Sequence, residues 1–193
     1  MSPMKKIAIL ASGSGTLAEA IFEAVEKKVL HCSIEALICD KPDALVINRA
    51  REHKIPVHLY PMKEDRKLWN LELLDYLKSL DLDLVVSAGF MRILDHTVTS
   101  SLPIINSHPA LLPLFPGAHA VRDALAAGAT KTGTTIHWVD AGVDTGEIIA
   151  QAELDIAPED NEETLHERIK ILERSLIVAT IEQLLSAMEN GRS

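Results

Sequence analysis

Asn106, His108 and Asp144 are three polar residues whose side chains could together catalyse acyl transfer. The amide of Asn106 can donate hydrogen bonds to an oxygen that acquires negative charge during a reaction. The imidazole of His108 titrates near neutral pH and can move a proton. The Asp144 carboxylate can orient that ring and favour its protonated form. An oxyanion donor, a proton carrier and an orienting acid suit a reaction that passes through a tetrahedral intermediate.

No activated nucleophile accompanies these three residues. Ser107 lies between Asn106 and His108, and on a continuing strand its side chain faces the opposite side of the sheet. We therefore expect direct transfer without a covalent bond to the enzyme. The alternative is structural: a histidine packed within the proline-rich segment 107–117, and an aspartate that caps a turn.

Two further histidines lie close to this set in the sequence. His137 falls on an expected strand and shares a face with Thr135 and Val139, so a structural role and a catalytic role are equally compatible with it. His119 follows a Pro-Gly pair at the start of an expected helix, where it could help to bind a substrate.

A glycine-rich turn, residues 13–18 with the sequence GSGTLA, follows one expected strand and begins a helix. It fits the G-x-G-x-x-A pattern, and Asp40 lies at about the spacing of a ribose-binding acid. Small residues also let a phosphate approach the backbone N–H groups at a helix start. Three interpretations therefore remain open: one substrate phosphate, which we favour, a dinucleotide, or a tight turn without a ligand.

Short apolar runs alternate with amphipathic segments along the chain. This alternation predicts a doubly wound, Rossmann-like α/β fold with a mostly parallel sheet. The expected strands are residues 6–11, 34–39, 57–60, 83–87, 104–106, 133–139 and 148–154. The expected helices are residues 16–28, 44–53, 65–80, 118–127 and 161–189. The link of residues 140–146 is too short for a parallel crossover, so the last two strands should form an antiparallel pair near the C-terminal end.

The bulk composition excludes several classes of protein. The 193 residues contain no evident linker, which predicts a single domain over residues 1–193. A net charge of −9 argues against a nucleic-acid partner. Cys32 and Cys39 form neither a disulfide framework nor a zinc site, and both are expected to be buried. No apolar run has the length of a signal peptide or a membrane span, so we expect a cytoplasmic protein with no membrane partner.

Three sequence blocks, in order, resemble the folate-dependent formyltransferases. They are residues 88–94 (AGFMRIL), 106–113 (NSHPALLP) and 137–146 (HWVDAGVDTG), followed by Gln151. The resemblance covers essentially the whole chain. It implies that 10-formyltetrahydrofolate, as co-substrate, donates a formyl group to the amine of glycinamide ribonucleotide, the third step of purine synthesis. It implies no metal.

The resemblance also implies roles for individual residues. Asn106 and His108 would handle the tetrahedral intermediate, and Asp144 would tune His108. The folate-binding residues that it implies are Arg66, Met91, Arg92, Ile93, Leu94, Asn106, Asp140, Ala141, Gly142, Val143 and Asp144. The ribonucleotide-binding residues that it implies are Gly15, Thr16, Leu17 and Glu173, the last of these near the amine. Because a phosphate turn accounts for the same glycines, the resemblance disfavours the dinucleotide interpretation.

The chain departs from the family pattern at two positions. Leu17 stands where an asparagine is common, which puts one contact at the phosphate turn in doubt, and Val121 stands where a second histidine is frequent. Formyltetrahydrofolate hydrolase carries a regulatory domain ahead of this catalytic half, for which we expect no room here. Methionyl-tRNA formyltransferase adds a C-terminal RNA-binding domain, whereas this chain ends on an acidic helix.

A small-ligand-binding protein without catalytic activity is a further alternative. It is disfavoured because a binding protein needs none of Asn106, His108 and Asp144, and all three are present. The sequence leaves open whether the protein is a monomer or a homodimer.

Overall fold

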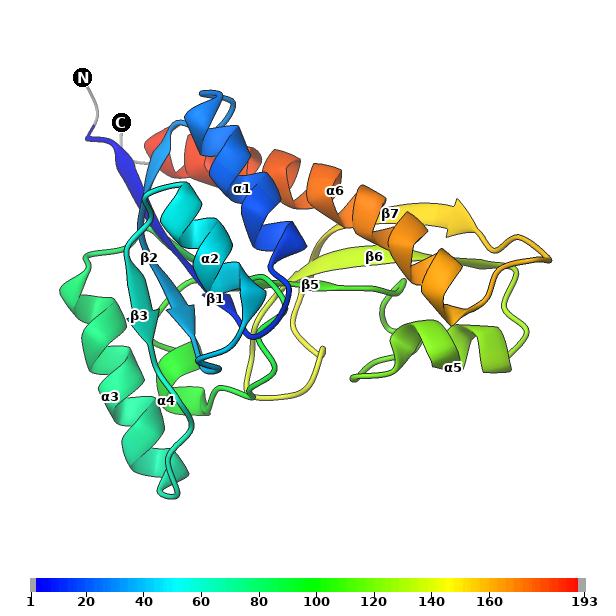
Figure 1. Ribbon diagram of the computed structural model, residues 1–193, viewed down its shortest axis with the longest axis horizontal. Coiled ribbons are helices and arrows are strands. Elements are labelled where there is room, and N and C mark those ends of the chain that lie inside the picture. Colours follow the sequence, from blue (N-terminus) through cyan, green and yellow to red (C-terminus); the bar gives the residue numbers. More distant parts are fainter. Residues whose placement is uncertain (1–2, 191–193) are drawn as a thin grey trace.

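A seven-stranded sheet forms the centre of the computed structural model, which describes residues 3–190 (Figure 1). The strands lie in the order β3-β2-β1-β4-β5-β6-β7. Their bounds are β1 Lys5–Ala11, β2 Cys32–Cys39, β3 Val57–Leu59, β4 Leu84–Ser87, β5 Ile104–His108, β6 Lys131–Trp138 and β7 Ile148–Asp155. Strands β1 to β5 are parallel, β6 is antiparallel to β5, and β7 is antiparallel to β6. The predicted fold class, including the antiparallel pair near the C-terminal end, is confirmed.

Two layers of helices cover the two faces of this sheet (Figure 1). One layer contains α1 (Thr16–Glu26), α2 (Leu45–Glu52) and α6 (Glu162–Asn190), and the other contains α3 (Arg66–Ser79) and α4 (His96–Thr99). In β1, Ile7 and Ile9 belong to the core of the first layer, whereas Ala8 and Leu10 belong to that of the second. The strand is buried on both faces, which explains its continuous apolar run.

The short helix α5 (Ala120–Ala126) packs against the first turns of α6. Val121 contributes to a small apolar cluster there with Leu165 and Ile169. Val121 is therefore a buried apolar side chain that stabilises the α5–α6 contact.

Two local features of the fold differ from the expected element bounds. Strand β5 continues through His108 instead of ending at Asn106, because Ser107 and His108 pair with residues of β6. Helix α4 was not expected. It begins after Asp95, whose side chain accepts a hydrogen bond from Val98 N. A helix of this length is too short to produce a periodic sequence pattern.

The two cysteines are buried and unpaired, as predicted from composition. Burial raises the pKa of the Cys32 thiol to about 11, so this thiol is protonated at neutral pH. Within residues 3–190, no helix has both the length and the apolar character needed to cross a membrane.

Candidate active site

A cavity of about 430 Å³ lies where the loops after β4, β5 and β6 meet. The ends of β4 and β5 form part of the carboxyl edge of the parallel strands, which is where open α/β sheets bind ligands. Asn106, His108 and Asp144 all line the cavity. Of the residues expected to bind folate, those that also line it are Met91, Arg92, Ile93, Leu94, Asp140, Gly142 and Val143. The tertiary structure thus gathers three distant sequence blocks around one cavity.

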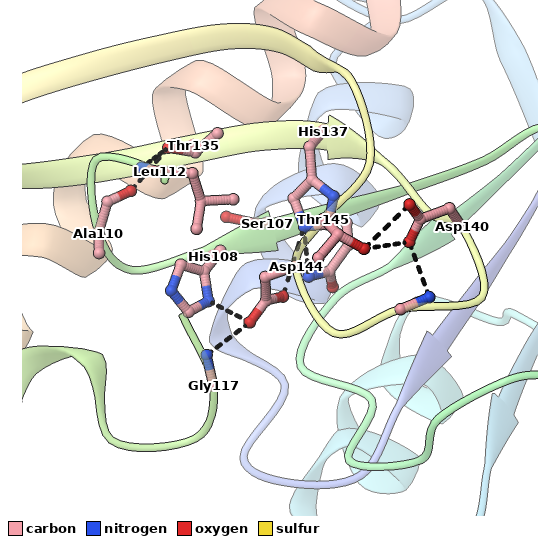
Figure 2. Close-up of polar contacts among 12 residues, drawn as sticks. Ser107, His108, Ala110, Leu112, Gly117, Thr135, His137, Asp140, Asp144 and Thr145 are labelled. Carbon is pink, nitrogen blue, oxygen red and sulfur yellow. Dashed lines mark hydrogen bonds and ion pairs between the residues drawn. The ribbon is translucent and has the colours of Figure 1, made fainter. Parts of the chain in front are cut away.

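His108 and Asp144 lie side by side in the cavity wall, with the ring pointing toward the carboxylate (Figure 2). His108 Nδ1 lies 3.2 Å from Asp144 Oδ2, and only 5% of the histidine side chain and 12% of the aspartate side chain are exposed. The other ring nitrogen, Nε2, lies 2.8 Å from the backbone oxygen of Phe115. Both partners are acceptors, so only the doubly protonated ring donates to both at once.

The Asp144 carboxylate is held by donors from separate segments. Gly117 N donates to Oδ2 at 2.8 Å, and His137 Nε2 lies 3.5 Å from Oδ1. Burial by itself would raise the pKa of Asp144. The hydrogen bonds from His137 and Gly117, and the charges of His108 and His137, outweigh that effect and hold the pKa below its ordinary value. Asp144 is therefore ionised throughout the neutral range.

The short connection that carries Asp144 is stabilised by its own polar contacts. Asp140 Oδ1 accepts hydrogen bonds from Gly142 N at 2.9 Å and from Thr145 Oγ1 at 2.7 Å (Figure 2). Asp144 has a φ of 53°, in the left-handed region that, apart from glycine, is adopted mainly by asparagine, aspartate and histidine. A Cβ at Gly146 would collide with the backbone oxygen of Trp138, so only glycine allows this close approach.

His137 contacts both Asn106 and Asp144 and lines the same cavity. Its Nδ1 is 2.9 Å from the Trp138 backbone oxygen, an acceptor, so Nδ1 carries a proton. Nε2 lies 3.2 Å from Asn106 Nδ2 and 3.5 Å from Asp144 Oδ1. The neutral ring accepts there from the Asn106 amide, whereas the protonated ring donates there to Asp144. The contact with Asn106 orients its amide and leaves its second N–H free for a ligand.

Ser107 faces the other side of β5, toward α6. Ser107 Oγ donates to Glu173 Oε1 at 2.7 Å and lies 3.3 Å from Thr134 Oγ1. Burial raises the pKa of Glu173, and the hydrogen bond from Ser107 and the charges of Lys170 and Arg174 only partly oppose this effect. Glu173 itself does not line the cavity, although its hydrogen-bond partner Ser107 does.

The remaining residues of the expected site lie outside the wall of this cavity. Arg66, the first residue of α3, donates from Nη2 to the Ile93 backbone oxygen at 3.1 Å, so it lies beside the 90–94 segment. Ala141 belongs to the connection around Asp140. Gly15 adopts a φ of 76° immediately before α1, and a Cβ there would collide with Val46. The backbone thus has its own need for glycine at position 15, independent of any ligand.

For two residues near the site, Asp40 and His166, sequence reasoning did not give the observed position. Asp40, considered above as a ribose-binding acid, instead forms a buried ion pair with Arg92: Arg92 Nε lies 2.5 Å from Asp40 Oδ2, and the Asp40 side chain is fully buried. This pair joins the end of β2 to the loop after β4. His166, on α6, also lines the cavity. His166 lies within the long amphipathic pattern of α6, and nothing in that pattern distinguishes a cavity-lining residue from any other helix residue.

The sequence profile of the formyl transferase family matches residues 5–181. The chain belongs to the formyl transferase family. A phosphoribosylglycinamide formyltransferase of Bacillus subtilis (strain 168) is 39% identical over 192 residues, which cover 97% of this chain and 98% of that protein.

Solved structures agree with this formyl transferase in fold. Phosphoribosylglycinamide formyltransferase from Bacillus halodurans has a TM-score of 0.91 and 44% identity, with 96% of this chain and 98% of that chain covered. Glycinamide ribonucleotide transformylase 1 from Symbiobacterium toebii has a TM-score of 0.91 and 34% identity, with 94% and 88% covered. Nearly all of the fold described here is therefore shared with members of the family.

The position of His137 generates a prediction about Asp144. Replacing His137 with alanine removes the hydrogen bond and charge that lower the pKa of Asp144, while much of the burial that raises it remains. We expect the Asp144 pKa to rise in His137→Ala, measured by carbon-13 NMR of the carboxyl group during a pH titration. His96→Ala, on the exposed helix α4, is the control and should leave the titration unchanged. An Asp144 pKa identical in wild type and His137→Ala would contradict this account.

Proposed function

We propose that this formyl transferase moves the formyl group of 10-formyltetrahydrofolate to the amine of glycinamide ribonucleotide. One observation carries the proposal: Asn106, His108 and Asp144 line one cavity, with His108 in contact with Asp144. The Bacillus relatives named above are phosphoribosylglycinamide formyltransferases, and their similarity to this chain covers 98% of each of them. This similarity supports the same substrates here. Both substrates are small metabolites, consistent with a cytoplasmic enzyme that has no nucleic-acid partner.

The reaction needs no covalent enzyme intermediate. The neutral amine attacks the formyl carbon; a C–N bond forms, and the carbonyl oxygen takes the electron pair. Collapse of the tetrahedral intermediate re-forms the carbonyl and breaks the bond to folate N10. The attacking nitrogen loses one proton and the departing N10 gains one, so the reaction is balanced without a net proton.

Each polar residue has a distinct part in this reaction. An N–H of Asn106 is available to the oxyanion, because the contact with His137 occupies at most one of the two amide hydrogens. His108 lies between Asp144 and the Phe115 backbone oxygen and can transfer a proton during the reaction. Asp144 is ionised and would stabilise positive charge on the ring when it forms. Preorganised donors of this kind need little rearrangement as charge develops.

Exposed apolar side chains beside the polar residues suit a flat aromatic ligand. Met91, Ile93 and Val143 line the cavity, and their exposed fractions are 66%, 51% and 46%, respectively. A folate ring system would cover this apolar surface and gain hydrophobic stabilisation. Arg66 lies beside Ile93 and would meet a carboxylate of the folate tail.

The ribonucleotide would bind on the side of the glycine-rich turn. Gly15 precedes α1 without a side-chain cap, so the N–H groups of Thr16 and Leu17 are available to a phosphate. Because the Leu17 side chain is apolar, it cannot hydrogen-bond to the phosphate, and only backbone N–H groups would do so. Glu173 would approach the amine from behind β5, after a change from its present contact with Ser107.

The direct test mixes the protein with glycinamide ribonucleotide and 10-formyltetrahydrofolate and follows the release of tetrahydrofolate. We expect release only when both substrates are present. Release that does not depend on the ribonucleotide would indicate hydrolysis of the folate instead. No release under either condition would reject the proposed reaction.

His108→Ala tests the proton carrier. We expect kcat to fall by roughly 10²- to 10⁴-fold, the usual contribution of an acid–base group. The matched control is His31→Ala, an exposed histidine before β2 with no assigned role, which should retain wild-type rates. A wild-type rate for His108→Ala would remove His108 from the mechanism.

Asn106→Ala tests the oxyanion donor. Loss of one such donor should cost about 2.7–4 kcal/mol of transition-state stabilisation, seen as a lower kcat with little change in KM. The measurement is steady-state kinetics with both substrates varied. An unchanged kcat accompanied by a higher KM would show that Asn106 binds substrate without stabilising the transition state.

A further inference from the structure

The loop of residues 109–117, here called the proline-rich loop, supplies two backbone groups that touch the catalytic pair. The Phe115 backbone oxygen lies 2.8 Å from His108 Nε2, and Gly117 N donates to Asp144 Oδ2 at 2.8 Å. The imidazole and the carboxylate therefore each depend on where this loop lies.

Two side chains from the neighbouring strands anchor the same loop. Thr135 on β6 and Gln151 on β7 lie opposite each other in the antiparallel register. Leu112 N donates to Thr135 Oγ1 at 3.0 Å, and Gln151 Nε2 donates to the Leu112 backbone oxygen at 2.9 Å. Both backbone polar groups of Leu112 are thus bound by side chains outside the loop.

The Thr135 hydroxyl uses its full hydrogen-bonding capacity in this anchor. It donates to the Ala110 backbone oxygen at 2.7 Å and accepts from Leu112 N (Figure 2). It also accepts from Gln151 Nε2 at 2.9 Å. A hydroxyl has one donor and two acceptor positions, so none remains. Thr135 is fully buried, so water cannot readily replace a lost partner.

We propose that Gln151, through Thr135 and Leu112, is a positioning residue for His108 and Asp144. The inference rests on the proposed function, because positioning is measured on that reaction. Gln151 touches neither catalytic side chain; it holds the loop whose backbone does. Loss of the Gln151 amide leaves the Leu112 oxygen without its partner and frees the loop to shift.

The kinetic test combines Gln151→Met with His108→Ala. Methionine keeps the length of the side chain and removes the amide. We expect kcat to fall on the order of 10-fold in Gln151→Met with KM nearly unchanged, less than the roughly 100-fold cost of a full 1 Å misplacement. In the His108→Ala background the same change should lower kcat no further, because residues that act through one group are not additive.

Thr135 offers a rescue and a matched control on one strand. Thr135→Val should lower kcat like Gln151→Met, whereas Thr135→Ser keeps the hydroxyl and should restore activity. Thr132, on the same strand, is buried with a hydroxyl that has no hydrogen-bond partner. Thr132→Val should leave kcat unchanged. An equal loss of kcat in the presence and absence of the His108 side chain would overturn the proposal and indicate general destabilisation.

A second measurement does not depend on activity. The nitrogen-15 signals of the His108 ring, assigned by their loss in His108→Ala, should shift in Gln151→Met and stay in place in Thr132→Val. Unmoved His108 signals in Gln151→Met would overturn the positioning role. Shifted signals in a protein that transfers no formyl group would support positioning and reject the proposed function. If the wild type transfers the formyl group and Gln151→Met is equally active, the proposed function is supported and the positioning role is rejected.

Discussion

The ionised carboxylate of Asp144 is the interaction on which the site depends. Only 12% of this side chain is exposed, and a charge so far from water is stable only where donors and positive charge surround it. Its partners come from β5 (His108), from β6 (His137) and from the proline-rich loop (Gly117). Satisfying one buried carboxylate therefore brings three segments together, and the cavity lies where they meet.

The reversal of β6 arranges the partners of the catalytic strand. Because β6 is antiparallel to β5, His137 lies opposite Asn106 and Thr135 lies opposite His108. His137 then orients the Asn106 amide, and Thr135 holds the backbone of the loop that reaches the His108 ring. One change of strand direction thus supplies support to both catalytic residues of β5.

Two carboxylates on opposite sides of β5 have contrasting environments. Hydrogen bonds and positive charge lower the pKa of Asp144, whereas burial dominates at Glu173 and raises its pKa. Two carboxyl groups near one strand therefore differ in pKa in opposite directions, and the lowered one is the partner of His108. Such divergence between neighbouring acids is a common basis for division of roles in active sites.

The sequence by itself determined the α/β class, the places of the main strands along the chain, and the position of Asn106 and His108 at the end of one strand. Apolar periodicity and turn residues are local signals, so they are readable without the tertiary structure. The sequence did not determine the role of His137: alternation assigns a side chain to a face, but only the antiparallel register places it against Asn106. The same holds for Asp40, whose spacing fitted a ribose-binding acid in the disfavoured dinucleotide interpretation and which the tertiary structure pairs with Arg92. The support of the proline-rich loop by Gln151 was also decided only in three dimensions, since strand register and loop closure join residues that no local pattern connects.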